Sequence, residues 1–381
     1  MQRKTFADVD NLQYRLRAAG ALLGVTDTTL RGYADNAGLT IKRASDITPG
    51  APAVRIFGVD TMFDLSQWRR SRGYTLAPAS SVSKPKIIAV SVVKGGTGKT
   101  TTAVEVAVHF QLLGLRTLLI DLDVQANATQ MLGYEPDLTI EEAPAYDLHE
   151  DAIVTSTFAT VLLPFLERSR PGHSLKTQET CHIIKKPFGE NGPHLVAADT
   201  YLGDIEQSLA NAKGQRELFI KHLLNAAYEG LIPGFDTSTY DVILFDCPPN
   251  VSFTSTGALA AADIVVAPIR MDAFSVKGMV KIMQEIESLN STYGIKPNLV
   301  ILPTHYSPQL VRIGRMQEQL NKYRDMLAQN VISASEEYPK SLDFYLPLSL
   351  QKPTSTAAKE YRMFSEFLLK RIVKPSKGKL T

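Results

Sequence analysis

The sequence predicts an α/β protein with a mostly parallel twisted sheet flanked by helices, preceded by a small, mainly helical domain. Beyond residue 85, short apolar runs alternate with amphipathic stretches, which is the pattern of parallel strands covered by helices on both faces. A glycine-rich loop joins the first apolar run to a helical stretch. Residues 76–84 show neither the alternation of a strand nor the spacing of an amphipathic helix, and they are rich in Ala and Ser. This composition indicates a linker. We therefore divide the chain into an N-terminal domain, 1–75, a linker, 76–84, and a larger domain, 85–381.

Composition and charge are those of an ordinary globular protein of 381 residues. No apolar run is long enough to cross a membrane and the N-terminus is polar, so we expect a cytoplasmic protein with no membrane association. In that compartment Cys181 and Cys247 are expected as free thiols. Residues 1–80 hold 11 lysines and arginines against 7 aspartates and glutamates. This modestly basic segment fits contact with DNA, and a solvated surface gives the same count about as often.

Six apolar runs are the expected strands of the larger domain. They are apolar along their whole length because both faces of such a sheet are buried. Their ranges are 86–93, 117–121, 194–198, 241–246, 264–268 and 299–303. Between residues 141 and 193 the pattern weakens, and glycine and proline interrupt it. We expect a surface insertion with one or two helices there.

Residues 94–102 read Lys-Gly-Gly-Thr-Gly-Lys-Thr-Thr-Thr, between the first expected strand and a stretch of helical periodicity. Glycines in such a loop let the backbone curl so that its N–H groups point at a phosphate, assisted by the positive end of the helix. Lys99 would then bridge the β- and γ-phosphates, and the Thr100 hydroxyl would bind Mg²⁺. The sequence therefore predicts a site for ATP or ADP with Mg²⁺, formed by Lys94, Gly95, Gly96, Thr97, Gly98, Lys99, Thr100 and Thr101.

Lys94 is a second lysine, at the start of the loop, where it is poorly placed to reach the leaving group of its own nucleotide. The pattern Lys-Gly-Gly-x-Gly-Lys-Thr resembles the deviant Walker A motif of the ParA/MinD ATPases. That resemblance implies a P-loop NTPase fold and a homodimer in which Lys94 reaches the phosphates bound by the partner, as an arginine finger does. Lys94 and Lys99 are then both catalytic.

A second segment, residues 118–129, is similar to the switch segment of the same family, although Val124 stands where a proline is usual. It places Asp121 and Asp123 at the carboxyl end of an expected strand. The resemblance implies that Asp123 orients the attacking water and is therefore catalytic. It also implies that Asp121 lies near the Mg²⁺ shell.

A third segment, residues 241–249, resembles the Walker B strand. The resemblance implies that Asp246 holds Mg²⁺ through water. In the family, the segment after a later strand flanks the adenine, so Pro303 and Thr304 are candidates for contacts to the base. An apolar strand that ends in aspartate is common by itself. Three motifs in the family's order and spacing are a much stronger signal.

Residues 14–36 have the form of a helix-turn-helix. Two leucines close the first helix, followed by a turn glycine, an inward valine, a threonine cap and a closing glycine: Leu22, Leu23, Gly24, Val25, Thr26 and Gly38. The second helix would present four side chains to the major groove of DNA: Thr28, Thr29, Arg31 and Tyr33.

The stretch that follows, residues 41–70, looks like a wing and then a helix, similar to winged helix-turn-helix modules of the MerR type. Lys42, Arg43 and Arg55 would meet phosphates, which position a protein on DNA without reading its sequence. A helical hairpin that serves only dimerisation has the same packing pattern and remains an alternative.

A DNA-binding head joined by a flexible linker to such an ATPase resembles the larger, regulatory ParA proteins of low-copy plasmids. This resemblance implies a nucleoid-associated homodimer that binds DNA non-specifically in its ATP form and represses its own operon. It also implies a ParB-like, centromere-binding partner that stimulates hydrolysis. Candidate residues for the non-specific DNA contact are Arg312, Arg315, Lys340, Lys352, Lys359 and Arg362.

Two other functions remain open. A MinD-like, membrane-cycling ATPase would need a C-terminal amphipathic membrane helix, and residues 360–375 are amphipathic. The same residues can cover the sheet of the ATPase, and we favour that interpretation. A transcriptional repressor that uses ATP only as a ligand is the other possibility. It predicts operator binding that survives the loss of Lys94.

Overall fold

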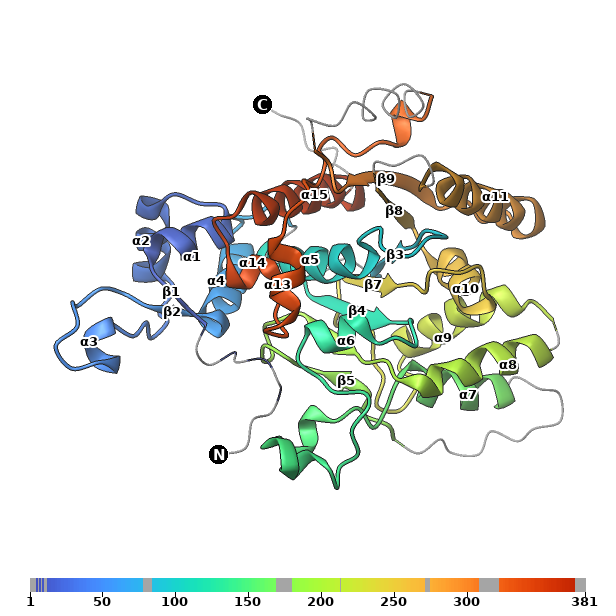
Figure 1. Ribbon diagram of the computed structural model, residues 1–381, viewed down its shortest axis with the longest axis horizontal. Coiled ribbons are helices and arrows are strands. Elements are labelled where there is room, and N and C mark those ends of the chain that lie inside the picture. The colour runs from blue at the N-terminus through green and yellow to red at the C-terminus, as the bar shows by residue number, and fades with distance from the viewer. Residues whose placement is uncertain are drawn as a thin grey trace.

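The protein is described by a computed structural model (Figure 1). Most of the expected linker, residues 78–83, lies outside the residues it describes, as do Arg312 and Arg315, two of the candidate DNA contacts. The described residues are Thr5, Ala7, Val9, 12–77, 84–168, 180–212, 214–270, 275–307 and 322–373.

A seven-stranded sheet forms the centre of the larger domain (Figure 1). The strand order is β5-β6-β4-β7-β3-β8-β9, and neighbouring strands are parallel except for β5 with β6. The six expected strands and the mostly parallel α/β fold are confirmed, and β5 is an additional short strand. The strands are β3 (Lys86–Val90), β4 (Thr117–Asp121), β5 (Ile184–Lys185), β6 (His194–Val196), β7 (Val242–Asp246), β8 (Ile264–Arg270) and β9 (Asn298–Thr304).

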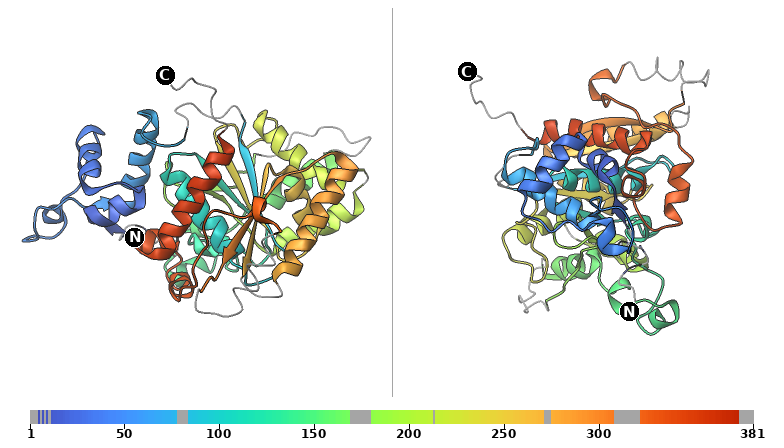
Figure 2. Two further views of the ribbon diagram at one scale, coloured as in Figure 1. Left: turned by 90° about the horizontal axis from the view of Figure 1, so that it is seen from above. Right: turned by 90° about the vertical axis from the view of Figure 1, so that its left-hand side faces the viewer.

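Helices cover both faces of this sheet (Figure 2). In β3, Ile88 and Val90 belong to one hydrophobic core, and Ile87 and Ala89 to the other. Helices α5 and α15 contribute to the first core, and α7 to α11 to the second. The helices are α5 (Lys99–Leu112), α6 (Asn127–Met131), α7 (Phe158–Arg168), α8 (Gly203–Asn211), α9 (Phe219–Tyr228), α10 (Phe253–Ala261), α11 (Ser275–Tyr293), α13 (Glu337–Leu342), α14 (Leu348–Gln351) and α15 (Thr356–Ile372).

The expected insertion at 141–193 is only partly a surface feature. Its first part contains two short 3₁₀ helices, η1 (Ala143–Tyr146) and η2 (Glu150–Ala152), around a small apolar cluster of their own. Helix α7, in contrast, is built into the main core, where Phe158 and Leu162 are fully buried. The weak sequence pattern hid this role because Pro164 lies inside the helix.

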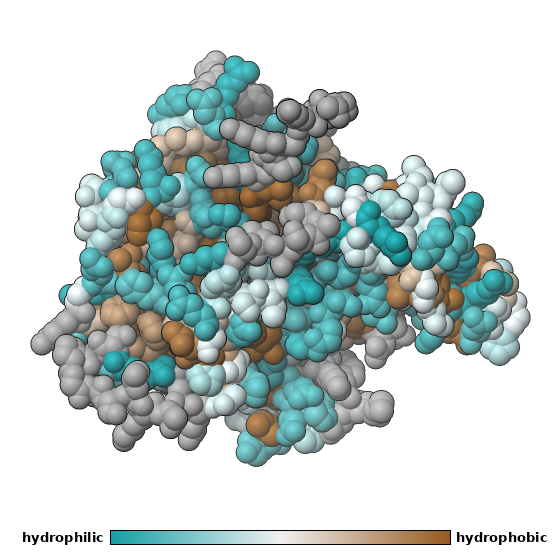
Figure 3. All heavy atoms as spheres, turned by 180° about the vertical axis from the view of Figure 1, so that it is seen from behind, coloured by the Kyte–Doolittle hydropathy of each residue, from teal (hydrophilic) through white to brown (hydrophobic). Residues whose placement is uncertain are grey.

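The C-terminal helix α15 packs against α5. Its apolar residues Tyr361, Phe364 and Leu368 are buried in the core that α5 also lines. The core-packing interpretation of this amphipathic segment is confirmed. In the described parts of the chain, no helix combines the length and apolarity that a membrane span requires. The face of the molecule seen in Figure 3 is largely hydrophilic, with separate hydrophobic areas between.

Buried polar groups tie α5 to α14 and α15. The Glu105 carboxyl accepts the Ser349 N–H at 3.3 Å and hydrogen-bonds the Ser349 hydroxyl, whose oxygen lies 2.9 Å from Nε2 of His109. The hydroxyls of Thr102 and Tyr361 hydrogen-bond at 3.0 Å. Burial raises the pKa of Glu105 to about 7 and lowers the pKa of His109 to about 3. Below pH 7, Glu105 is therefore protonated in the folded protein, and it hydrogen-bonds the Ser349 hydroxyl next to a neutral His109.

We expect Glu105→Gln to remove much of the pH dependence of stability between mildly acidic and mildly alkaline conditions. The ordinary pKa of 4.5 applies in the unfolded chain. In the window between the two pKa values, the folded protein keeps a proton that the unfolded protein has released. The free energy of unfolding therefore falls as pH rises through this window, by about 2 to 3 kcal/mol for this group. Glutamine keeps the shape and the donor of the protonated acid but cannot ionise.

Urea unfolding of both proteins, followed by circular dichroism at about pH 5 and about pH 8, measures this difference. The variant should lose less stability than the unmodified protein between the two conditions. Other buried carboxyls titrate in both proteins and cancel in the comparison. Equal pH dependence in the two proteins would show that Glu105 is ionised at low pH in the folded state.

The N-terminal domain contains the expected pair of helices and turn. Helix α1 (Leu16–Leu23) ends at Gly24, whose φ of 66° lies in the left-handed region that favours glycine. Helix α2 (Asp27–Asn36) begins after Thr26, whose hydroxyl oxygen accepts the Thr29 N–H at 3.2 Å. The predicted turn and helix cap are confirmed.

A paired segment follows α2. Backbone hydrogen bonds join Ala44 to Val54 and Ile56 to Lys42, so the chain returns antiparallel to itself. This segment leads through the second strand of a two-stranded sheet into a long helix. The remaining elements are β1 (Gln13–Tyr14), which pairs antiparallel with β2 (Phe57–Gly58), α3 (Ala44–Ile47) and α4 (Val59–Ser71).

The N-terminal domain packs directly on the larger domain. Arg70 on α4 forms a buried ion pair with Asp241 and donates to the Gly114 carbonyl at 3.0 Å. Gly114 has a φ of 92°, and a Cβ atom there would lie 2.8 Å from Cβ of Arg70, so this approach requires glycine. The Tyr14 hydroxyl donates to the Leu350 carbonyl at 2.8 Å. These contacts and a shared hydrophobic core join the two domains.

This docking differs from the separate head that the linker suggested. The physical reason is the apolar face of α4, where Met62, Phe63 and Leu65 are fully buried in the core shared with α5. A small isolated domain would leave part of that face in water. In Figure 1, α2 and α3 lie at the end of the N-terminal domain that points away from the sheet. The larger domain therefore does not cover α2, which carries candidate DNA contacts.

Candidate nucleotide and magnesium site

The three predicted motifs meet at one edge of the sheet. In the parallel register Val90 of β3 and Asp121 of β4 both lie opposite Asp246 of β7. The glycine-rich loop follows β3, so it leaves the sheet at the same edge as the two carboxylates. Ligands of open α/β sheets bind at this carboxyl edge. The fold therefore brings the glycine-rich loop and two acidic side chains together.

The glycine-rich loop is open on its outer side. Gly96 and Gly98 have φ angles of 67° and 86°, a conformation that favours glycine. A Cβ atom at Gly95 or Gly96 would meet no other atom within 4 Å. Helix α5 begins at Lys99, directly after the loop, so its first N–H groups and its positive end face the same space. This geometry suits a phosphate.

Lys99 lies at the base of the loop and is only 7% exposed. Its Nζ donates to the Lys94 carbonyl at 2.9 Å. Burial lowers the pKa of Lys99, and the nearby charges of Asp246 and Asp123 oppose that shift. The lysine is thus a buried cation next to two acids. Lys94 is half-buried at the mouth of the loop.

Asp246 has a buried carboxylate whose two oxygens have no hydrogen-bond partner among the described residues. Burial and the charge of Asp121 raise its pKa well above the ordinary value. The Thr100 hydroxyl faces this carboxylate and acts against that shift, but it does not meet the geometry of a hydrogen bond. The Thr97 hydroxyl is also buried without a partner among these residues. A carboxylate in this state requires a proton or a cation.

These residues fit Mg²⁺ as a ligand of the nucleotide complex. The described part of the chain has no group of three or more His, Cys, Asp or Glu side chains that could hold a metal by themselves. Mg²⁺ at phosphate sites is held by one or two carboxylates together with phosphates and water. Thr100 and Asp246 are the residues that would hold it here.

Asp121, the other predicted magnesium residue, already accepts hydrogen bonds from neighbouring protein groups. Its carboxylate accepts the N–H and the hydroxyl of Thr129 at 3.0 and 2.8 Å and the N–H of Asp123 at 3.1 Å. Burial raises its pKa to about 7. Asp123 is nearly buried and accepts the Gln125 N–H at 3.0 Å. Of the two acids at the strand ends, Asp246 is the one with free oxygens.

Pro303 and Thr304, the candidates for adenine contacts, lie in β9 beside the loop. The Thr304 hydroxyl is buried and donates to the Thr97 carbonyl at 2.8 Å. The Pro303 carbonyl accepts the Ile332 N–H at 2.8 Å. Thr304 therefore anchors the glycine-rich loop to β9, and contact with the base stays a prediction. The anchoring role was missed because only the fold brings the two segments together.

Both cysteines are free, as expected. Cys247 follows Asp246 and is fully buried. Burial raises the pKa of its thiol above the usual range. This thiol is therefore a packed side chain beside the site, since the thiolate is the reactive form.

Residues 85–301 match the sequence profile of the AAA domain family AAA_31, over more than half of the chain. The chain belongs to the AAA_31 family. It is similar to the chromosome-partitioning ATPase Soj of Thermus thermophilus, which is 27% identical over 294 residues, 76% of this chain and 98% of that protein.

Solved structures share the fold of this AAA_31 protein. One is cobyrinic acid a,c-diamide synthase of Mycobacterium smegmatis with a bound ATP analogue and magnesium, with a TM-score of 0.56, 22% identity and coverage of 75% of this chain and 95% of that one. Another is a plasmid partition protein of Borrelia burgdorferi, with a TM-score of 0.51, 21% identity and coverage of 76% and 99%. At these identities the likeness establishes the fold and no more.

The AAA_31 match begins at residue 85, just before β3, so the N-terminal domain lies outside it. In that domain four of the candidate DNA residues are exposed: Thr28, Arg31, Lys42 and Arg43. The other three are engaged within the domain. The Thr29 hydroxyl bonds that of Thr26 at 2.9 Å, Arg55 pairs with Asp35, and Tyr33 stacks on Tyr74.

The late basic residues also divide into exposed and engaged side chains. Lys340 and Lys359 are exposed. Lys352 pairs with Glu337 at 2.8 Å on the surface. Arg362 donates to the Ala21 carbonyl at 3.2 Å and thus forms part of the contact between the two domains. Lys340 and Lys359 are the better candidates for DNA among these four.

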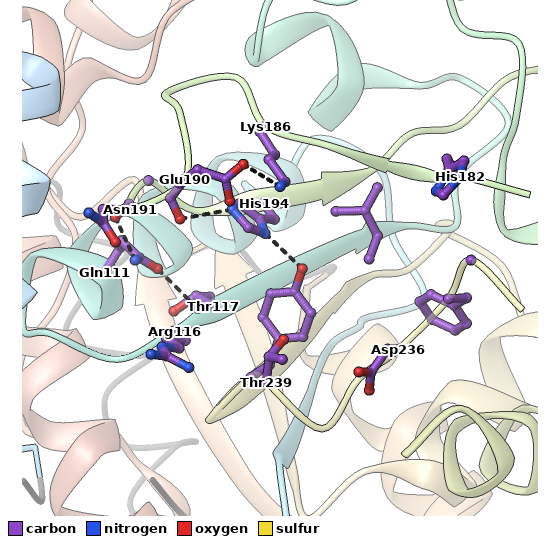
Figure 4. Close-up of a pocket in the computed structure, with 15 residues that line it drawn as sticks. Gln111, Arg116, Thr117, His182, Lys186, Glu190, Asn191, His194, Asp236 and Thr239 are labelled. Carbon is purple, nitrogen blue, oxygen red and sulfur yellow. Dashed lines mark hydrogen bonds and ion pairs between the residues drawn. The ribbon is translucent and has the colours of Figure 1, made fainter. Parts of the chain in front are cut away.

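A cavity of about 650 Å³ lies at the opposite, amino edge of the sheet (Figure 4). Its polar groups are largely paired with one another. Lys186 forms an ion pair with Glu190, and Nδ1 of His194 lies 2.7 Å from the Tyr240 hydroxyl. None of the nucleotide motifs contributes to its lining. The candidate active site of this AAA_31 protein is therefore the carboxyl edge.

Proposed function

We propose that the chain is a ParA-type partition ATPase of the larger plasmid kind. In this proposal ATP and Mg²⁺ bind at the glycine-rich loop, and the ATP-bound protein is a homodimer that binds nucleoid DNA non-specifically. A ParB-like, centromere-binding partner stimulates hydrolysis to ADP and phosphate, which releases the dimer. The N-terminal domain binds the operator of its own operon. The protein works in the cytoplasm, associated with the nucleoid.

The observation that carries this proposal is the meeting of Lys99, Asp123 and the unpartnered carboxylate of Asp246 beside the open loop. The family match supports nucleotide hydrolysis at such a site. The name of a similar protein, a chromosome-partitioning ATPase, supports DNA segregation as its purpose.

The reaction proposed for the site depends on positioning and charge neutralisation by the protein rather than on covalent catalysis. Lys99 neutralises charge on the β- and γ-phosphates, and Asp123 orients the attacking water. Mg²⁺, when bound, neutralises the remaining phosphate charge, with Thr100 and Asp246 as its protein ligands. Lys94 supplies a further positive charge to the partner's nucleotide. Hydrolysis is then slow in a monomer because its site lacks one cation.

A dimer across this edge has support from the surface around the site. Val124 follows Asp123 and is 40% exposed, and Val251 follows the Walker B segment and is 46% exposed. Both are apolar side chains on segments that leave the carboxyl edge of the sheet, after β4 and β7 respectively. A second copy that covers the edge would bury them and would also exclude water from the phosphates.

The exposed residues of the N-terminal domain support a DNA-binding role for it. Thr28 and Arg31 lie on α2, and Lys42 and Arg43 lie on the paired segment beyond it. In this proposal α2 reads the major groove, while Lys42 and Arg43 hold phosphates. Docking of the head on α5 leaves these side chains open to a duplex.

The MinD-like alternative loses support because the apolar side of α15 is already buried against α5. The repressor alternative makes a different prediction from partition. A repressor that uses ATP only as a ligand needs neither hydrolysis nor stimulation by DNA. Phosphate release therefore separates the two functions.

The test measures phosphate release by the full chain with ATP and Mg²⁺ alone, with non-specific DNA, and with DNA plus the product of the neighbouring gene of its operon. Hydrolysis should be slow alone and rise about tenfold or more with DNA and partner. Operator binding without any stimulated hydrolysis would reject the partition proposal in favour of the repressor.

A double variant, Lys42→Ala with Arg43→Ala, separates the roles of the two domains. It should lose operator binding in a gel-shift assay but keep stimulation of hydrolysis by non-specific DNA. Lys370→Ala, an exposed lysine on α15, serves as the matched control and should retain both. Unchanged operator binding in the double variant would argue against the paired segment as a phosphate contact.

A further inference from the structure

Thr129 occupies the centre of a buried hydrogen-bond network beside the candidate site. It lies on α6 and is fully buried. Its N–H and its hydroxyl both donate to Oδ2 of Asp121, at 3.0 and 2.8 Å. The same hydroxyl oxygen accepts the Ala198 N–H at 2.8 Å, just beyond the end of β6. One side chain therefore links β4, α6 and the segment after β6.

Asp121 extends this network to the loop that carries Asp123. Its Oδ1 accepts the Asp123 N–H at 3.1 Å. Within the loop, the Asp123 carboxylate accepts the Gln125 N–H at 3.0 Å, and the Asp123 carbonyl accepts the Ala126 N–H at 2.9 Å. The orientation of Asp123 is thus fixed by contacts that begin at Thr129.

The same loop contains a strained residue. Ala126 has a φ of 51°, a left-handed conformation that costs free energy for any residue with a Cβ atom. Such a conformation persists only where surrounding contacts determine it. Ala126 is held by Asp123 before it, by α6 after it and by burial of its own methyl group in the second hydrophobic core, and Thr129 links α6 to β4. Without these contacts the loop would relax.

The free oxygens of Asp246 and the committed oxygens of Asp121 indicate different roles for the two acids. Asp246 has no hydrogen-bond partner among the described residues and suits a cation. Asp121 accepts three hydrogen bonds, all from its own loop and from α6. A carboxylate with three of its about four acceptor sites occupied in this way holds the backbone in place.

We propose that Thr129 is a positioning residue: it fixes Asp121, and through Asp121 the loop that presents Asp123 to the site. The catalytic part of this inference rests on the ATPase function proposed above. The structural part rests only on the contacts of Thr129, Asp121 and Asp123. Thr129 acts on the reaction through the loop and does not touch the nucleotide.

Thr129→Val tests the inference because valine keeps the shape of threonine and removes its hydroxyl. Amide hydrogen exchange of residues 122–130 in the nucleotide-free protein should become about tenfold faster, since the hydroxyl's hydrogen bonds to the Asp121 carboxyl and from the Ala198 N–H are both lost. ATP hydrolysis should fall about tenfold, with the KM for ATP changed by less than about twofold. Thr129→Ser keeps the hydroxyl and should restore both values.

Thr237→Val is the matched control. Thr237 is also a fully buried threonine, and its hydroxyl contacts the Leu224 carbonyl, away from the candidate site. This variant should leave hydrolysis and the exchange of residues 122–130 unchanged. If valine at position 129 prevents folding, Thr129→Cys replaces the hydroxyl by a weak donor of similar size and should give intermediate exchange.

Two results overturn the inference: exchange of residues 122–130 that is the same in Thr129→Val as in the unmodified protein, or damage in Thr129→Ser equal to that in Thr129→Val. If Thr129→Cys is the variant studied, exchange of residues 122–130 equal to that of the unmodified protein also overturns the inference. Failure of the proposed ATPase function is recognised separately, because the unmodified protein would then release no phosphate while the exchange comparison still tests the positioning.

Discussion

Replacing Lys99 by methionine is expected to lower the rate of ATP hydrolysis by about 100-fold or more. Lys99 is buried at the base of the loop, and its Nζ is already oriented by the Lys94 carbonyl. In the proposed reaction it neutralises phosphate charge that no other buried cation of the same loop can reach. Methionine keeps the apolar stem and most of the volume of the lysine side chain. The substitution therefore removes mainly its positive charge.

Phosphate release measures this effect, and thermal unfolding shows whether the variant is folded. Lys86→Met is the matched control. Lys86 opens β3 and pairs with Asp263 on the surface at 3.0 Å, a contact of little energetic value. The control should hydrolyse ATP within about twofold of the unmodified rate. Equal rates in Lys99→Met and the unmodified protein would remove the glycine-rich loop from the reaction.

Lys94→Ala is expected to separate nucleotide binding from hydrolysis. If Lys94 acts on the partner's phosphates, its loss leaves the loop and Lys99 of each protomer intact. Binding of a fluorescent ATP analogue by the monomer should change by less than about threefold, while hydrolysis falls about 100-fold. ATP-dependent dimerisation should be lost as well, because the phosphate charge that faces the partner is no longer neutralised.

Analytical ultracentrifugation with and without ATP measures the dimer, and fluorescence titration measures binding. Lys94→Arg keeps the positive charge and provides the control, with dimerisation retained in part. A large loss of nucleotide binding by the Lys94→Ala monomer would indicate that Lys94 serves its own site. In that case the deviant pattern of the loop would have no role across a dimer interface.

The fold was predictable from the sequence because its signals are local. The strands of a doubly covered parallel sheet are apolar along their length, as in 242–246, and the loop glycines are adjacent in the chain. The meeting of Asp121, Asp246 and the loop followed from the rule that parallel strands present their carboxyl ends at one edge. Gly24 and Thr26 marked the turn in the head for the same local reason.

Contacts between distant segments were not predictable. Thr129 and Thr304 are ordinary threonines in the sequence, and only the fold places them against Asp121 and the Thr97 carbonyl. The docking of the head depends on Arg70 meeting Asp241 across 171 positions of the chain. A linker composition reports local flexibility and contains no information about such a surface.

The docking has a consequence for how the two domains work together. Helix α5 begins directly after the glycine-rich loop and packs against α15 and against α4 of the head. The head is therefore fixed to the helix that carries Lys99. Its orientation on the ATPase is set by the shared core and the Arg70–Asp241 pair rather than by the length of the linker.

The most direct test of the central claim, a site completed by Lys94 of the partner, is hydrolysis by a mixture of two inactive variants. Lys94→Ala keeps Asp123 and lacks the lysine, while Asp123→Ala keeps the lysine and lacks the water-orienting acid. In a mixed dimer the Lys94→Ala protomer has its own Asp123 and receives Lys94 from its partner. Mixing at equal concentrations should raise hydrolysis well above that of either variant alone, to at most about a quarter of the unmodified rate, because each mixed dimer has one complete site and Lys94→Ala weakens pairing. A mixture that stays as inactive as either variant alone, although mixed dimers form, would contradict the account.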